Sequence, residues 1–99
     1  MKSAVTELNR VFESRIRLGI MSVLAVREAA DFTTLKGVLE VTDGNLASHL
    51  AVLEKNRYVR MRKEFVQRKP QTTYQLTDAG RKAFAAHIDA LERLIRSGR

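Results

Sequence analysis

Apolar residues recur every four positions along the first quarter of the chain. The stripe is formed by Leu8, Phe12, Ile16, Ile20 and Leu24. A helix needs this spacing to bury one face, so the pattern predicts a long first helix over about residues 4–27. A shorter apolar repeat at Leu35, Val38 and Leu39 predicts a second helix of about two turns. The turn before it, residues 31–33, offers a capping hydroxyl at Thr33.

A third helix is predicted over about residues 43–56. Thr42 is suited to cap it, and Asp43 places negative charge at the positive end of the helix. The apolar face consists of Leu46, Leu50 and Leu53. This spacing leaves another set pointing away from the core, namely Gly44, Asn45, Ser48, His49 and Val52.

The hydrophobic period changes from helical to alternating after this helix. Val59 and Met61 alternate with arginines, and Tyr74 and Leu76 alternate with polar residues, as in two antiparallel strands. Residues 67–70 are predicted to form the tip of the hairpin, because Pro70 cannot donate to a sheet ladder. We call this hairpin, residues 58–76, the wing.

A final helix is predicted over about residues 78–96, behind a cap at Thr77. Its apolar residues have the spacing of a helix that packs on another helix, and they are Phe84, Ile88, Leu91 and Ile95. The order of elements predicts a winged helix-turn-helix, a mainly α fold with a small β-hairpin (α+β). A chain of 99 residues can form one hydrophobic core, so residues 1–99 are expected to be a single domain.

Basic residues concentrate on the predicted wing. The chain has 18 Lys and Arg against 11 Asp and Glu, and this net charge of +7 favours a polyanionic partner such as nucleic acid. A basic hairpin can hold phosphates or enter a minor groove, although lysines and a proline on an edge strand also prevent aggregation. We expect DNA contacts from the third helix and the wing, at Thr42, Asp43, Gly44, Asn45, Ser48, His49, Lys63, Gln67, Arg68 and Lys69.

Residue types that are absent narrow the function further. The chain has no cysteine, which excludes a disulfide framework, a thiolate metal site and a cysteine nucleophile. It has no nucleophile elbow, no phosphate-binding glycine loop and no paired ligand motif, so an enzyme, a metal and a cofactor are not expected. His87 is expected at a surface or an interface. The sequence shows neither a leader segment nor a membrane span, so we expect a cytoplasmic protein without a membrane partner.

Three segments resemble one group of regulators: SRIRLGIM (residues 14–21), TDGNLASHL (residues 42–50) and QRKPQTTYQLTDAG (residues 67–80). They are similar to the small stand-alone winged-helix transcriptional regulators related to the MarR and ArsR types, over about residues 12–94. The resemblance implies a dimeric bacterial or archaeal regulator whose recognition helices lie in adjacent major grooves of a pseudo-palindromic operator in double-stranded DNA. It assigns Arg68 and Lys69 to wing contacts, and it assigns four residues of the third helix to the groove, namely Gly44, Asn45, Ser48 and His49. Metal-sensing relatives use Cys and His clusters, which this chain lacks.

The apolar stripes of the first and last helices are longer than a core of this size needs. We therefore expect these helices of two subunits to pack together in a homodimer, with the recognition helices about 34 Å apart. The expected interface residues are Leu8, Val11, Phe12, Phe84, Ile88, Leu91 and Ile95. Two alternatives stay open. In the first, both helices cover the core of a monomer. In the second, the domain serves protein contacts within a larger assembly. No effector pocket can be identified from these residues.

Overall fold

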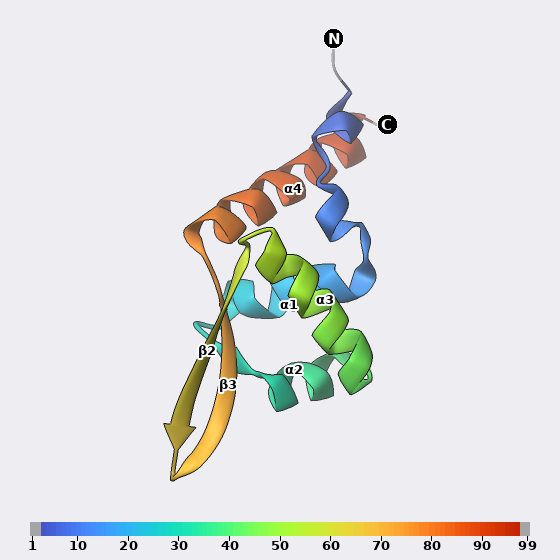
Figure 1. The fold of residues 1–99 in the computed structure, drawn as a ribbon. Coiled ribbons are helices and arrows are strands. Elements are labelled where there is room, and N and C mark those ends of the chain that lie inside the picture. The colour runs from blue at the N-terminus through green and yellow to red at the C-terminus, as the bar shows by residue number, and fades with distance from the viewer. Residues whose placement is uncertain (1–2, 98–99) are drawn as a thin grey trace.

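The computed structural model describes residues 3–97, which form four α-helices, two short 3-10 helices and three strands (Figure 1). In chain order these are η1 (Ala4–Glu7), η2 (Arg10–Glu13), α1 (Arg15–Val26), β1 (Ala30–Asp31), α2 (Phe32–Leu39), α3 (Asp43–Lys55), β2 (Val59–Val66), β3 (Lys69–Leu76) and α4 (Asp78–Ser97). The predicted winged helix-turn-helix is confirmed.

The predicted first helix is wrong in its first half, where η1 and η2 replace the expected α-helical turns. Two polar side chains interrupt the helix. Asn9 Oδ1 accepts a hydrogen bond from the Val11 N–H at 2.9 Å, and Ser14 Oγ accepts one from the Arg17 N–H at 3.3 Å. Each of these side chains satisfies a backbone donor at the start of a new element, so the chain begins again twice instead of continuing.

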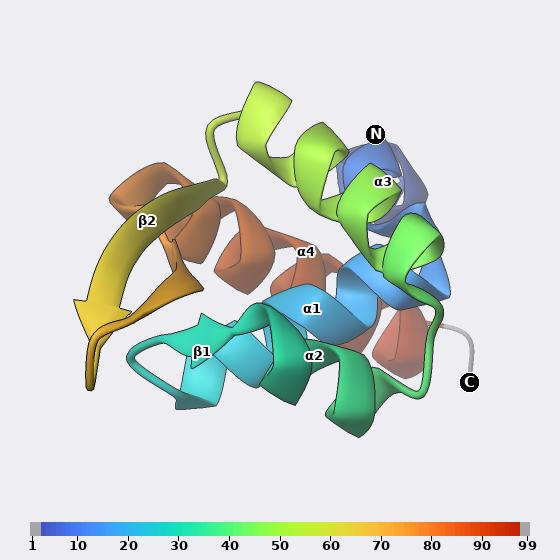
Figure 2. The same cartoon turned by 60° about the horizontal axis from the view of Figure 1, so that its bottom comes forward.

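The hydrophobic core lies between α1, α2 and α3 and continues onto the strands (Figure 2). Its buried residues are Phe12, Ile20, Met21, Leu24, Ala30, Leu35, Leu46, Leu50, Leu53, Val59, Tyr74 and Leu76. The predicted apolar face of α3 is confirmed, since Leu46, Leu50 and Leu53 are at most 1% exposed. Full burial of a leucine contributes about 1.5–3 kcal/mol, so these three side chains fix how α3 is rotated about its axis.

The sheet is antiparallel, with strand order β1-β3-β2. The sequence pattern missed β1, which pairs Ala30 with Tyr74 and Asp31 with Thr73. Two residues are too short to show an alternation. Asp31 also caps α2 through a 2.6 Å hydrogen bond that its Oδ1 accepts from the Thr34 N–H, so the expectation of a hydroxyl cap at Thr33 is wrong.

The two ends of the molecule carry different elements. The hairpin of β2 and β3 projects from one end, and α4 crosses the other end (Figure 1). This arrangement gives the described residues a long shape of 56 × 25 × 21 Å. The predicted cap of α4 is confirmed, because Thr77 Oγ1 accepts a hydrogen bond from the Gly80 N–H at 2.9 Å. At the far end of α4, Arg93 Nη1 donates to Glu7 in η1 at 2.6 Å.

Candidate nucleic-acid interface

The start of α3 has the cap that the sequence predicts. Thr42 Oγ1 accepts a hydrogen bond from the Asn45 N–H at 3.2 Å. Asp43, the first helical residue, forms an ion pair with Lys36 of α2, with 2.8 Å between Nζ and Oδ1. Lys36 therefore offsets a negative charge that would otherwise repel phosphate at this end of α3.

The outward face of α3 is confirmed for three of its five predicted residues. Gly44, Asn45 and Ser48 are exposed, opposite the buried leucines of the same helix. A Cβ added at Gly44 would meet no atom within 4 Å, so this part of the surface is open to a close approach by another molecule. His49 and Val52, predicted on the same face, are half-buried, so part of each side chain remains accessible there.

His49 is held by a residue that the sequence pattern did not single out. Arg17 Nη1 of α1 lies 2.9 Å from His49 Nδ1, and Arg17 Nε donates to the Val11 carbonyl at 2.6 Å. Burial lowers the pKa of the His49 imidazole, and the positive charge of Arg17 lowers it further. His49 is therefore neutral near pH 7. Arg17 lies within one of the segments that carry the resemblance, but no periodicity relates it to α3.

The turn of the wing consists of Gln67 and Arg68, which have positive φ values of 53° and 67°. Two such residues form the type I′ turn that joins strands most tightly. Pro70 lies within β3 opposite Phe65, so its predicted place at the tip is wrong. In a two-residue hairpin the pair next to the turn, here Val66 and Lys69, is hydrogen-bonded. Hydrogen-bonded and non-hydrogen-bonded pairs alternate along the ladder, so Phe65 and Pro70 form a non-hydrogen-bonded pair. The missing N–H of Pro70 therefore removes no bond to β2.

The charged side chains of the wing divide between its two faces. All residues from Met61 to Pro70 are exposed. Because successive side chains of a strand point to opposite faces, Lys63 lies on the face of the buried Val59, toward the helices, and Arg62 lies on the outer face. Phe65 shares the face of Lys63 and is 78% exposed, an apolar surface residue that the sequence analysis missed.

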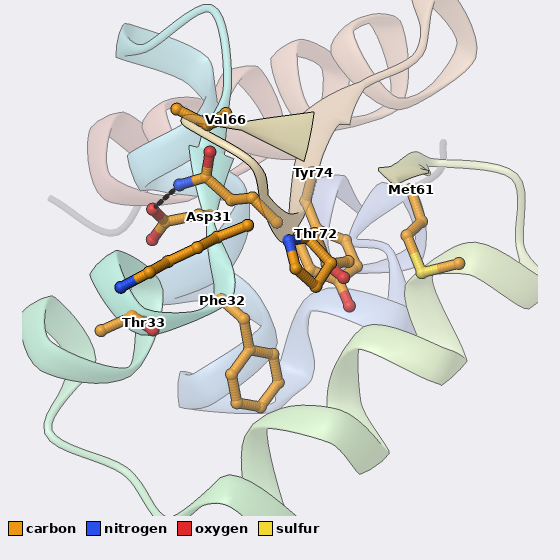
Figure 3. Close-up of a pocket in the computed structure, with 10 residues that line it drawn as sticks. Asp31, Phe32, Thr33, Met61, Val66, Thr72 and Tyr74 are labelled. Atoms are coloured by element: carbon orange, nitrogen blue, oxygen red, sulfur yellow. Dashed lines mark hydrogen bonds between the residues drawn. The ribbon is translucent and has the colours of Figure 1, made fainter. Parts of the chain in front are cut away.

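A cavity of about 600 Å³ lies between the wing and the start of α2 (Figure 3). Asp31, Phe32 and Thr33 line it on one side, and strand residues that include Met61, Thr72 and Tyr74 line it on the other. Asp31 Oδ2 accepts a 2.6 Å hydrogen bond from Gln71 Nε2. The pKa of Asp31 is lowered, mainly by the hydrogen bond from the Thr34 N–H. Asp31 thus joins the wing to α2.

The residues expected at a dimer interface divide into two groups. Phe12 is 2% exposed and packs against the rings of Tyr58, Phe84 and His87, so its expected place on an outer surface is wrong. Val11 and Phe84 also pack against the core. The others stay accessible to different degrees: Leu8, Ile88 and Leu91 are half-buried, and Ile95 is 69% exposed.

The sequence analysis expected His87 at a surface or an interface. In the structure it lies in the interior of the chain instead. It is 4% exposed, and its Nδ1 accepts a 3.0 Å hydrogen bond from the Asn9 N–H. Burial lowers its pKa, although Glu13 opposes this effect. Within residues 3–97, no three His, Cys, Asp or Glu side chains form a group that could hold a metal ion. None of the helices described there is long and apolar enough to cross a membrane.

The chain is similar to a protein compared by sequence and to several solved structures. An uncharacterized protein of Methanocaldococcus jannaschii is 35% identical over 80% of this chain and 86% of its own. The structure of a transcriptional regulator homologue from Pyrococcus horikoshii OT3 superposes with a TM-score of 0.89 over 97% of each chain, at 33% identity.

Two more distant structures show the fold alone. One is a MarR-family regulator of Porphyromonas gingivalis W83, with 19% identity, a TM-score of 0.67 and 86% and 81% of the two chains covered. The other is MepR of Staphylococcus aureus in its DNA complex, with 13% identity, a TM-score of 0.78 and 97% and 78% covered. The family model described as winged helix DNA-binding domain matches residues 16–95. The resemblance stated from three segments is confirmed, and the chain belongs to the winged helix DNA-binding domain family.

Proposed function

We propose that this protein is a transcriptional regulator that binds double-stranded DNA as a homodimer and selects its site by sequence. In this proposal α3 enters the major groove, and the wing contacts the backbone or the minor groove of the same duplex. The proposed contacts from α3 and its cap are Thr42, Asp43, Gly44, Asn45, Ser48 and His49, and those from the wing are Lys63, Gln67, Arg68 and Lys69.

One arrangement carries the proposal. The start of α3 and the tip of the wing lie at the same end of the molecule, away from α4 (Figure 1). The exposed part of α3 at this end has polar and small residues, and the exposed wing is rich in basic ones. Sequence-specific binding to a duplex needs both features, because positive charge binds any phosphate backbone while polar side chains in the major groove distinguish base pairs.

The backbone of the turn supports a role for Arg68. A residue with a Cβ is disfavoured at φ 67°, and glycine would fit a type I′ turn better. The arginine at this disfavoured position supports a role for its side chain outside the fold, since strained residues are common at functional sites. A guanidinium at the tip of a wing is suited to a narrow minor groove or to phosphates.

The variant Arg68→Gly tests the proposal, because it relieves the turn and removes the charge. We expect a hairpin at least as stable as in the wild type, together with weaker binding to every duplex and a salt slope smaller by about one unit. Lys82→Ala is the matched control, since Lys82 is an exposed cation on α4, at the other end. Equal losses in both variants would show that general charge, and not the wing, binds the duplex.

A protein-contact module is the alternative function. Exposed Phe65 on the wing is the observation that favours it, because apolar side chains are typical of protein interfaces. Selection of bound duplexes from a random DNA pool separates the two functions. A regulator yields an enriched motif with two half-sites, whereas a protein-contact module yields no enriched sequence and no steep salt dependence.

The homodimer is proposed to form through α4. Ile88, Leu91 and Ile95 leave an apolar stripe on this helix that the core does not use fully. Ile95→Lys should shift sedimentation from a dimer to a monomer at micromolar concentration, since a charge buried in an apolar contact is not compensated. Arg96→Lys on the next, exposed position is the control. A wild type that sediments as a monomer would contradict this part of the proposal.

A further inference from the structure

Arg17 connects three elements through its side chain. It belongs to α1, its Nε donates to the Val11 carbonyl of η2 at 2.6 Å, and its Nη1 contacts His49 Nδ1 of α3 at 2.9 Å. The hydrogen bond to Val11 fixes the plane of the guanidinium. The orientation of the His49 ring is therefore set from outside α3, by a side chain that is itself anchored.

The chemistry of this contact decides where the proton of His49 lies. A guanidinium has only donors, so Nδ1 must present its lone pair to Arg17. In a neutral imidazole the proton then lies on Nε2. A doubly protonated ring would set a donor against a donor and a positive charge against a positive charge. Among residues 3–97, Nε2 has no hydrogen-bond partner, so this N–H is free to donate to another molecule.

We infer that Arg17 is a positioning residue that makes His49 a hydrogen-bond donor, and only a donor, toward the DNA base that α3 reads. This inference rests on the proposed function and specifies the chemistry of one contact. Neighbouring Asn45 and Ser48 can donate or accept, whereas an Nε2–H can only meet an acceptor. Guanine, adenine and thymine present acceptors in the major groove, and cytosine presents only an amino donor. His49 therefore disfavours cytosine at the base it faces.

Nitrogen-15 NMR of the histidine rings in the wild-type protein tests the first step directly. The expected spectrum near pH 7 shows His49 with a protonated Nε2 and a bare Nδ1. A proton on Nδ1, or a doubly protonated ring, would overturn the inference. This measurement needs neither DNA nor a variant, so it holds even when Arg17→Met impairs folding or when the protein binds no duplex.

A double-mutant cycle on the selected duplex tests the second step. Arg17→Met should reduce the preference against cytosine at one position by about fivefold, the factor expected for one hydrogen bond. His49→Ala should do the same at the same position, and adding Arg17→Met to His49→Ala should change this preference no further. Arg15→Met is the matched control, since Arg15 is an exposed arginine on the same helix.

The outcomes separate the inference from the proposed function. Independent effects of the two variants, or effects at different base positions, would overturn the role of Arg17. Duplex binding by the wild type would still support the proposed regulator in that case. A uniform loss over all sequences from Arg17→Met would show that Arg17 binds phosphate itself, and this also overturns the inference. Absence of any duplex binding by the wild type contradicts the proposed function and leaves the tautomer to the NMR measurement.

Discussion

The substitution Gly80→Ala should destabilise the protein strongly, although alanine normally favours a helix. Gly80 lies in the first turn of α4, directly against the chain between α3 and β2. A Cβ at this position would lie 2.0 Å from the Tyr58 carbonyl oxygen, far inside the 3.4 Å at which ordinary contact begins. The obstacle is backbone, which no rotamer change can move.

The size of the stability loss follows from the contacts that break when α4 moves away from Tyr58. Moving α4 away breaks the 3.1 Å hydrogen bond from the Thr77 N–H to the Tyr58 carbonyl and the 2.6 Å bond from the Thr77 hydroxyl to the Arg57 carbonyl. Each bond contributes about 1 kcal/mol, and overpacking costs about 1–3 kcal/mol more. The helix preference of alanine returns about 1 kcal/mol. The expected net loss is therefore about 2–4 kcal/mol.

Chemical and thermal unfolding at one fixed protein concentration measure this loss. A domain of this size loses about 4–8 °C in Tm per kcal/mol, so Gly80→Ala should melt at least about 10 °C below the wild type. Gly37→Ala is the control, because a Cβ at Gly37 of α2 meets nothing within 4 Å. We expect the control to gain about 0.5–1 kcal/mol. A Gly80→Ala protein as stable as the wild type would refute the reasoning.

Two further predictions concern other anchors of the fold. His87 has a lowered pKa in the folded protein, so below pH 6.5 the unfolded chain takes up a proton first and stability decreases. Melting between pH 7.5 and 5.5 should therefore show that stability falls by at most about 1.4 kcal/mol per pH unit because of this residue. The variant His87→Asn, whose amide oxygen can still accept from the Asn9 N–H, should lose that part of the pH dependence. An unchanged pH dependence would mean that His87 is not the group that titrates. Asp31→Ala should lower stability by about 1–3 kcal/mol, because it removes the cap on Thr34 and the hydrogen bond from Gln71. Asp31→Asn keeps an oxygen that can cap, so urea unfolding should rank it between Asp31→Ala and the wild type; equal losses in the two variants would argue against the cap.

Local sequence signals determined the parts of the fold that carry the proposed interface. The leucines of α3 recur with a helical period, and Thr42 before them is a good cap, so the helix and its buried face follow from neighbours in the sequence. The alternation around Val59 and Leu76 likewise predicted two strands, and the charge between them predicted a basic wing. These features need only contacts within one element or one hairpin.

Tertiary structure decided what the same residues do across elements. The stripe through Phe12 is spaced like a helix, yet Asn9 and Ser14 break the helix and turn Phe12 onto Tyr58 and Phe84. No spacing reveals such a break, because an interior helical position and a cap use the same polar side chains.

The contacts of the two histidines depend on tertiary structure in the same way. His49 and His87 are bound by Arg17 and by the Asn9 N–H, residues 32 and 78 positions away along the chain. A period of 3.6 or 2 relates only near neighbours, so the sequence determined which faces are apolar or basic. Packing alone decided that His49 contacts Arg17 on α1 and that His87 lies in the interior.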